Sequence, residues 1–166
     1  MDEHVVTGNA AIAMSVHELL RKRGETVAVA ESLTGGQLAA SLVEAPGASE
    51  TFRGGLIVYA TDLKTSLAGV PASLLAERGP VDLDIAVHLA AGARTRCGSD
   101  WGVATTGVAG PDPQGGKEPG TVFVAVSGPD SSDAYPLVLR GSRDQITGAT
   151  VTAALRLLHE ALDRNI

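Results

Sequence analysis

The chain has 166 residues, of which 44% are hydrophobic and only 3% aromatic, so a single domain with an aliphatic core is expected over 1–166. The formal net charge is −6 and no basic block is present, which argues against a nucleic-acid-binding surface. No apolar run reaches membrane-spanning length, and the acidic start Met1-Asp2-Glu3 lacks the pattern of a signal peptide. A cytoplasmic protein without nucleic-acid or membrane partners is expected.

The composition also bears on metal and redox chemistry. Cys97 is the one cysteine, so no intramolecular disulfide can form and no cysteine-based zinc site is visible. The four histidines lie far apart in the sequence, and none has the spacing of metal ligands. We therefore predict neither a metal nor a cofactor.

The first third of the chain predicts helices alternating with buried strands. Residues 1–8 are expected to form a loose leader, and an apolar helical stripe from Ile12 to Leu20 ends before Gly24. A strand at Val27–Ala30 leads into a second helix, for which Ser32 and Thr34 are natural N-caps. A second buried strand is predicted at 54–60, followed by a helix with Thr61 or Asp62 as its cap.

The rest of the chain adds helices and a hairpin. Pro71 begins a short helix that Gly79-Pro80 ends, and Asp82 or Asp84 caps a helix that ends near Cys97-Gly98. Strands are predicted at 101–106, 121–127 and 133–140, and a last helix at 143–162. The order predicts an α/β fold with three α/β/α layers and a mixed, mostly parallel sheet ending in an antiparallel hairpin.

The stretch Val27–Gly36 is the first candidate for a functional site. Ser32 stands at the carboxyl end of a predicted strand, where open α/β sheets bind ligands. The turn containing Thr34, Gly35 and Gly36 can present N–H donors to a phosphate or an oxyanion. The alternative is a simple helix cap without function.

Two other predicted strands also end in polar or glycine-rich turns, at 59–64 and 105–111. If the three strands are parallel neighbours, Ser32, Tyr59, Lys64 and Thr105 or Thr106 surround one pocket. A lysine can deprotonate a serine only when burial or another cation lowers its pKa. The structural alternatives are a solvated Lys64, a core phenol at Tyr59 and, for the glycine-rich loop 107–120, a wide turn.

Taken together and in order, five motifs resemble the C-terminal domain of the competence/damage-inducible protein CinA, whose stand-alone form is nicotinamide-nucleotide amidohydrolase. The resemblance covers about residues 10–163. The motifs are Ala30-Glu31-Ser32-Leu33-Thr34-Gly35-Gly36, Tyr59-Ala60-Thr61-Asp62-Leu63-Lys64, Thr106-Gly107-Val108-Ala109-Gly110-Pro111, Pro119-Gly120-Thr121-Val122 and Gly141-Ser142-Arg143-Asp144.

The resemblance implies an α/β/α fold that is often dimeric, so a homodimer or higher homo-oligomer is expected. It also implies hydrolysis of the carboxamide of nicotinamide mononucleotide, a small-molecule substrate, to nicotinic acid mononucleotide and ammonia. Ser32 matches the nucleophile and Lys64 its basic partner, with Tyr59 and Arg143 at further active-site positions. Further candidate substrate-binding positions are Thr34, Gly35, Gly36, Thr105, Thr106, Gly107 and Gly110.

The sequence departs from the family pattern at several positions. Leu33 stands where cysteine is common, Thr61 where asparagine is common, and Asp82 where serine is usual. Ser142 and Thr147 replace a usual aspartate and a frequent arginine near Arg143, and these changes could alter how a phosphate or carboxylate is held. A non-catalytic nucleotide- or phosphate-binding module, and an amidase for another small carboxamide, are the alternative functions.

Overall fold

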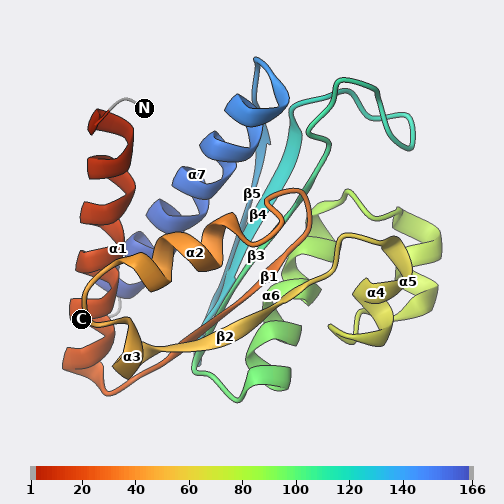
Figure 1. Cartoon of the computed structure of the whole chain (residues 1–166). Coiled ribbons are helices and arrows are strands. Elements are labelled where there is room, and N and C mark those ends of the chain that lie inside the picture. The colour runs from red at the N-terminus through yellow and green to blue at the C-terminus, as the bar shows by residue number, and fades with distance from the viewer. Residues whose placement is uncertain (1–2, 165–166) are drawn as a thin grey trace.

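A five-stranded sheet in the order β2-β1-β3-β4-β5 lies between two layers of helices (Figure 1). The structure is a computed structural model that describes residues 3–164. Its strands are β1 (Val27–Glu31), β2 (Phe52–Ile57), β3 (Trp101–Gly107), β4 (Thr121–Ser127) and β5 (Ser132–Val138). Strand β1 pairs parallel with β2 and β3, whereas β4 pairs antiparallel with β3 and β5. The predicted mixed α/β sheet with a terminal hairpin is confirmed.

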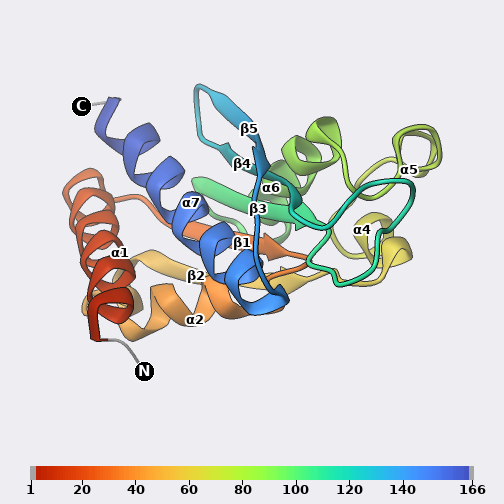
Figure 2. The same ribbon diagram turned by 90° about the horizontal axis from the view of Figure 1, so that it is seen from above.

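Helices cover both faces of this sheet, as Figures 1 and 2 show from two sides. One face packs against α1 (Glu3–Arg23), α2 (Gln37–Glu44) and α7 (Arg143–Arg164). The other face packs mainly against α6 (Leu83–Cys97), beside which lie the short helices α4 (Thr61–Ser66) and α5 (Ala72–Arg78). The short helix α3 (Ala48–Thr51) leads into β2. Among the helices of the described residues, none is both long and apolar enough to cross a membrane.

The two faces of the sheet differ in side-chain size, which sets how closely the helices approach. In β1, Val27 and Val29 join the core cluster under α1, α2 and α7, whereas Ala28 and Ala30 join the cluster under α6. A Cβ added at Gly102 of β3 would lie 2.0 Å from the carbonyl oxygen of Ala90 in α6. The alternation of valine with alanine or glycine therefore allows α6 to lie directly against the backbone of the sheet.

Several local predictions differ from the structure. Helix α1 already begins at Glu3, so the predicted leader is wrong over residues 3–8, while residues 1–2 lie outside the described part. The helix extends there because adding residues to an existing helix costs far less than starting one. Strand β2 ends at Ile57 and is an edge strand in which half-buried and exposed residues alternate, not the buried strand predicted at 54–60. Ala60, not Thr61 or Asp62, occupies the N-cap of α4.

Other predicted boundaries are confirmed. Asp82 caps α6, and its carboxylate accepts hydrogen bonds from the N–H groups of Asp84 and Ile85.

The buried His17 of α1 is hydrogen-bonded to Thr51 of α3, with 2.6 Å between Nδ1 and Oγ1. Because α3 leads into the start of β2, this pair lies at the opposite end of the sheet from the carboxyl ends of β1 and β3. Burial lowers the pKa of His17, which favours the neutral ring in the folded protein.

Candidate active site

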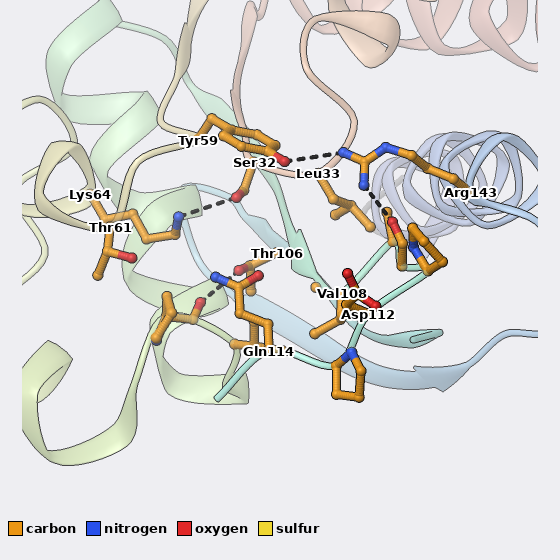
Figure 3. A pocket seen from close by; sticks show the side chains of 17 residues that line it. Ser32, Leu33, Tyr59, Thr61, Lys64, Thr106, Val108, Asp112, Gln114 and Arg143 are labelled. Carbon is orange, nitrogen blue, oxygen red and sulfur yellow. Dashed lines mark hydrogen bonds between the residues drawn. The ribbon is translucent and has the colours of Figure 1, made fainter. Parts of the chain in front are cut away.

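The carboxyl ends of the parallel strands β2, β1 and β3 meet at one edge of the sheet and surround a cavity of about 440 Å³ (Figure 3). Ser32 follows β1, Tyr59 follows β2, and Thr106 is the last residue but one of β3. The arrangement predicted from three polar strand ends is therefore present. The cavity is lined by Ser32, Leu33, Tyr59, Thr61, Lys64, Pro80, Val81, Thr106, Gly107, Val108, Ala109, Gly110, Pro111, Asp112, Pro113, Gln114 and Arg143.

A hydrogen bond joins the two residues predicted to react. Lys64 Nζ donates to Ser32 Oγ over 3.1 Å and to the carbonyl oxygen of Val58 over 2.8 Å (Figure 3). Lys64 lies in the middle of α4, so the first turns of this helix carry its amine from the end of β2 to the end of β1. The amine thus lies within the reach that general-base catalysis requires.

Lys64 is buried, with 1% of its surface exposed, and Ser32 is 7% exposed. Removal of the ammonium group from water lowers the pKa of Lys64 from 10.5 to about 8. The neutral form of Lys64 is therefore easier to reach than that of a solvated lysine, and a neutral amine can accept a proton. Lys64 is not the solvated helix residue of the structural alternative.

The turn after β1 is fixed differently from the sequence prediction. Helix α2 begins at Gln37 and its N-cap is Gly36, whose positive φ of 105° suits glycine, so the predicted caps Ser32 and Thr34 are wrong. The carboxylate of Glu31 serves instead, and accepts the N–H groups of Leu38 and Ala39. Ser32 is thereby left outside the helix with its hydroxyl directed to Lys64.

Four of the predicted substrate-binding residues lie outside the cavity lining. Thr34 and Thr105 are buried, and their hydroxyl groups are hydrogen-bonded to each other over 2.8 Å. The carbonyl oxygen of Thr105 accepts the N–H of Ser32 over 3.1 Å. These two threonines hold the serine turn from the side away from the cavity, and Gly35 and Gly36 complete the turn into α2. Thr106, Gly107 and Gly110, by contrast, do line the cavity.

Arg143 and Tyr59 both line the cavity and are hydrogen-bonded to each other. Arg143 Nη1 donates to the carbonyl oxygen of Gly110 over 2.6 Å, and Nη2 donates to the hydroxyl of Tyr59 over 3.1 Å (Figure 3). Tyr59 is 60% exposed, so it is not the core phenol of the structural alternative. The guanidinium thus ties the glycine-rich loop to the turn after β2 at the mouth of the cavity.

The position of Arg143 is fixed by the start of α7. Ser142 N donates to Gln145 Oε1 over 2.9 Å, and Gln145 N donates to Ser142 Oγ over 3.3 Å. This reciprocal pair is a capping box, with the amide of Gln145 reaching back to the backbone of the cap residue. Ser142, one of the departures from the family pattern, therefore holds the first turn of the helix that presents Arg143.

The loop 108–120 contributes polar lining residues that the sequence analysis did not single out. Its base is hydrogen-bonded to β4, because Val108 N donates to Thr121 O over 2.9 Å. At its tip, Gln114 and Lys117 exchange two backbone hydrogen bonds of 3.0 Å each. Asp112 and Gln114 of this loop both face the cavity (Figure 3). The glycine and proline content identified the loop, but gave no signal for which polar residues would face inward.

Comparison with known proteins identifies the family to which the chain belongs. Residues 9–162 match the family described as CinA C-terminal domain. The chain belongs to this family. This assignment confirms the resemblance carried by the five sequence motifs. Among the described residues of this CinA domain, no three histidine, cysteine, aspartate or glutamate side chains are grouped as metal ligands would be.

Relatives of this CinA domain are found among longer proteins. A CinA-like protein of Frankia casuarinae is 47% identical over 144 residues, which are 87% of this chain and 33% of that protein. A CinA-like protein of Geobacter sulfurreducens is 40% identical over 162 residues, which are 97% of this chain and 39% of that protein. The chain thus spans between a third and two fifths of the length of these curated relatives.

Solved structures of the family share the fold along nearly the whole chain. The competence/damage inducible protein CihA from Agrobacterium tumefaciens superimposes with a TM-score of 0.89 at 31% identity, covering 94% of this chain and 96% of that one. A CinA superfamily protein from Klebsiella pneumoniae gives a TM-score of 0.90 at 26% identity, covering 94% and 98%.

The buried amine predicts how the stability of this CinA domain depends on pH. Between pH 8 and 10.5 the unfolded chain holds the Lys64 proton more tightly than the folded protein, so stability should rise with pH in this window. Relative to a Lys64→Met variant, the wild type should gain up to about 3 kcal/mol in free energy of unfolding. Urea unfolding of both proteins between pH 8 and 10.5 measures this gain. A difference in free energy of unfolding that stays constant with pH would show that the amine is not desolvated.

Proposed function

We propose that this domain is an amidohydrolase that converts nicotinamide mononucleotide to nicotinic acid mononucleotide and ammonia. The observation that carries the proposal is the 3.1 Å hydrogen bond from the buried Lys64 amine to Ser32 Oγ at the wall of a cavity. A cavity of about 440 Å³ lies in the size range of small-molecule sites. The choice of substrate rests on the family resemblance together with the placement of Arg143.

In this mechanism Lys64 is both base and acid. The neutral amine takes the proton of Ser32, and the serine oxygen attacks the carboxamide carbon to give a tetrahedral oxyanion. Lys64 then gives that proton to the leaving nitrogen, the carbon–nitrogen bond breaks, and ammonia departs from an acyl-enzyme. Lys64 next takes a proton from water, the resulting hydroxide attacks the acyl carbon, and Ser32 leaves with the proton returned by Lys64.

The oxyanion needs hydrogen-bond donors beside Ser32. Ser32 N already donates to Thr105, and Gly35 N donates to Ser32 O, so neither is the donor required. The N–H of Leu33 follows the nucleophile and, within the described residues, has no protein acceptor, as is also true of the N–H of Thr34. We assign the oxyanion to the N–H of Leu33, because Leu33 lines the cavity and Thr34 does not. One such donor is typically worth roughly 100- to 1000-fold in rate.

Arg143 is assigned to the phosphate group of the substrate. A guanidinium suits phosphate because its N–H groups can bind two oxygens at once. Its hydrogen bonds to Gly110 and Tyr59 hold it at the cavity mouth, away from the buried Ser32–Lys64 pair. This separation allows a mononucleotide to place its phosphate at the mouth and its carboxamide at Ser32.

The first test removes each reacting group separately. Ser32→Ala and Lys64→Arg should each lower ammonia release from nicotinamide mononucleotide by roughly 1000-fold or more, because arginine cannot act as a base. Thr51→Val, which changes a residue bonded to His17 and absent from the cavity lining, serves as a folded control that retains the pair. A wild type that binds the mononucleotide without releasing ammonia would instead indicate a binding module, and an unimpaired Ser32→Ala variant would exclude the serine as nucleophile.

A second test addresses the substrate class. Ammonia release is compared for nicotinamide mononucleotide, nicotinamide riboside and nicotinamide, with wild type and Arg143→Ala. The variant should raise KM for the mononucleotide about 10- to 100-fold, the value of a hydrogen bond to a charged group, and leave the riboside unchanged. Equal effects on the mononucleotide and the riboside would contradict a phosphate role, and faster turnover of an unphosphorylated amide would point to another substrate.

A further inference from the structure

Glu31 is a buried carboxylate that the proposed mechanism does not use. It is the last residue of β1, directly before Ser32, and none of its surface is exposed. A carboxylate in such a position is costly unless hydrogen bonds replace its lost water. Its partners therefore indicate what the burial accomplishes.

Both oxygens of this carboxylate bind the first turn of α2. Leu38 N donates to Oε1 over 2.9 Å and Ala39 N donates to Oε2 over 3.0 Å. The actual cap residue, Gly36, has no side chain to satisfy these N–H groups. Glu31 thus replaces a local cap from seven and eight residues upstream, and its charge lies at the positive end of the helix dipole.

The backbone of Glu31 is hydrogen-bonded to the segment between β2 and α4 that leads to Lys64. Its carbonyl oxygen accepts the N–H of Val58 over 2.8 Å, and the carbonyl oxygen of Val58 accepts Lys64 Nζ over 2.8 Å. Glu31 therefore binds two parts of the site. Its side chain binds helix α2, which follows the serine turn, and its backbone binds the segment that holds Lys64. The serine turn, residues 32–36, lies between Glu31 and helix α2, and both of its ends are therefore held by Glu31.

We propose that Glu31 is a positioning residue: its carboxylate holds the first turn of α2 against the end of β1, so that the serine turn directs Ser32 Oγ to Lys64. This inference rests on the proposed function for its catalytic meaning. A merely structural Glu31 would affect stability alone, whereas a positioning residue affects the reactivity of Ser32 in the folded protein.

The test uses two readouts on Glu31→Gln, in which the amide keeps the volume but presents an NH₂ group where one N–H needs an acceptor. The first readout is the rate at which a fluorophosphonate labels Ser32, followed by mass spectrometry. The second is the split between kcat and KM for nicotinamide mononucleotide. Labelling and kcat should both fall about 10- to 100-fold, the cost of a small misplacement, while KM changes little.

Thr51→Val is the matched control, because it removes a buried hydrogen bond to His17 at the far end of the molecule. At a temperature where circular dichroism shows all proteins folded, it should label at the wild-type rate. Glu31→Asp, which keeps the charge but is one methylene shorter, serves if Glu31→Gln does not fold and should show the same loss.

The outcomes separate this inference from the proposed substrate. If the wild type is labelled at Ser32 but releases no ammonia from the mononucleotide, the substrate is wrong, and slower labelling of the Glu31 variants still supports the positioning role. If the folded Glu31 variants are labelled as fast as wild type, the positioning role is overturned. A wild type that is not labelled at Ser32 would overturn both.

Discussion

The hydrogen bond between the Lys64 amine and the Ser32 hydroxyl is the contact on which the proposed chemistry of this domain depends. It unites the ends of two parallel strands with a short helix, and it places an amine where water cannot solvate its charge. The desolvation that makes the ammonium form unfavourable is the same property that allows the amine to act as a base. A lysine on the surface at the same distance from a serine would remain charged and could not accept a proton.

The fold supplies this arrangement through the topology of its sheet. Strands β1, β2 and β3 run in the same direction, so the turns that follow them gather at one edge, and α6 lies close beneath because the facing side chains are alanine or glycine. The antiparallel strand β4 is linked to β3 by the loop 108–120, which returns over the same edge and supplies one wall of the cavity. The exposed Tyr59 follows the edge strand β2, and its hydroxyl accepts a hydrogen bond from Arg143 beside the cavity.

Much of this could be predicted from the sequence, because its signals are local. The Val27–Ala30 alternation, the glycine and proline punctuation and the Asp82 cap each specify an element through nearby residues. The meeting of Ser32, Tyr59, Lys64 and Thr106 followed from one further assumption, that successive strands are parallel neighbours. The capping of α2 by Glu31 could not be predicted in this way, since the sequence offered Ser32 and Thr34 at conventional cap positions and Glu31 looked like the end of a strand. The inward direction of Thr34 and Thr105 toward each other also depends on the register between β1 and β3, which residue pattern alone does not determine.

Because the chain has few lysines, the protonation of Lys64 can be measured directly. With three lysines in total, the side-chain resonances of Lys22, Lys64 and Lys117 can be separated in a protein carrying ¹³C-labelled lysine, and a Lys64→Arg variant assigns the one of interest. Titration of its Cε shift should give a pKa of about 8, as expected for the desolvated amine beside Ser32. A Lys64 resonance that titrates above pH 10 would contradict the account, because the amine would then be charged throughout the range in which it must accept the serine proton.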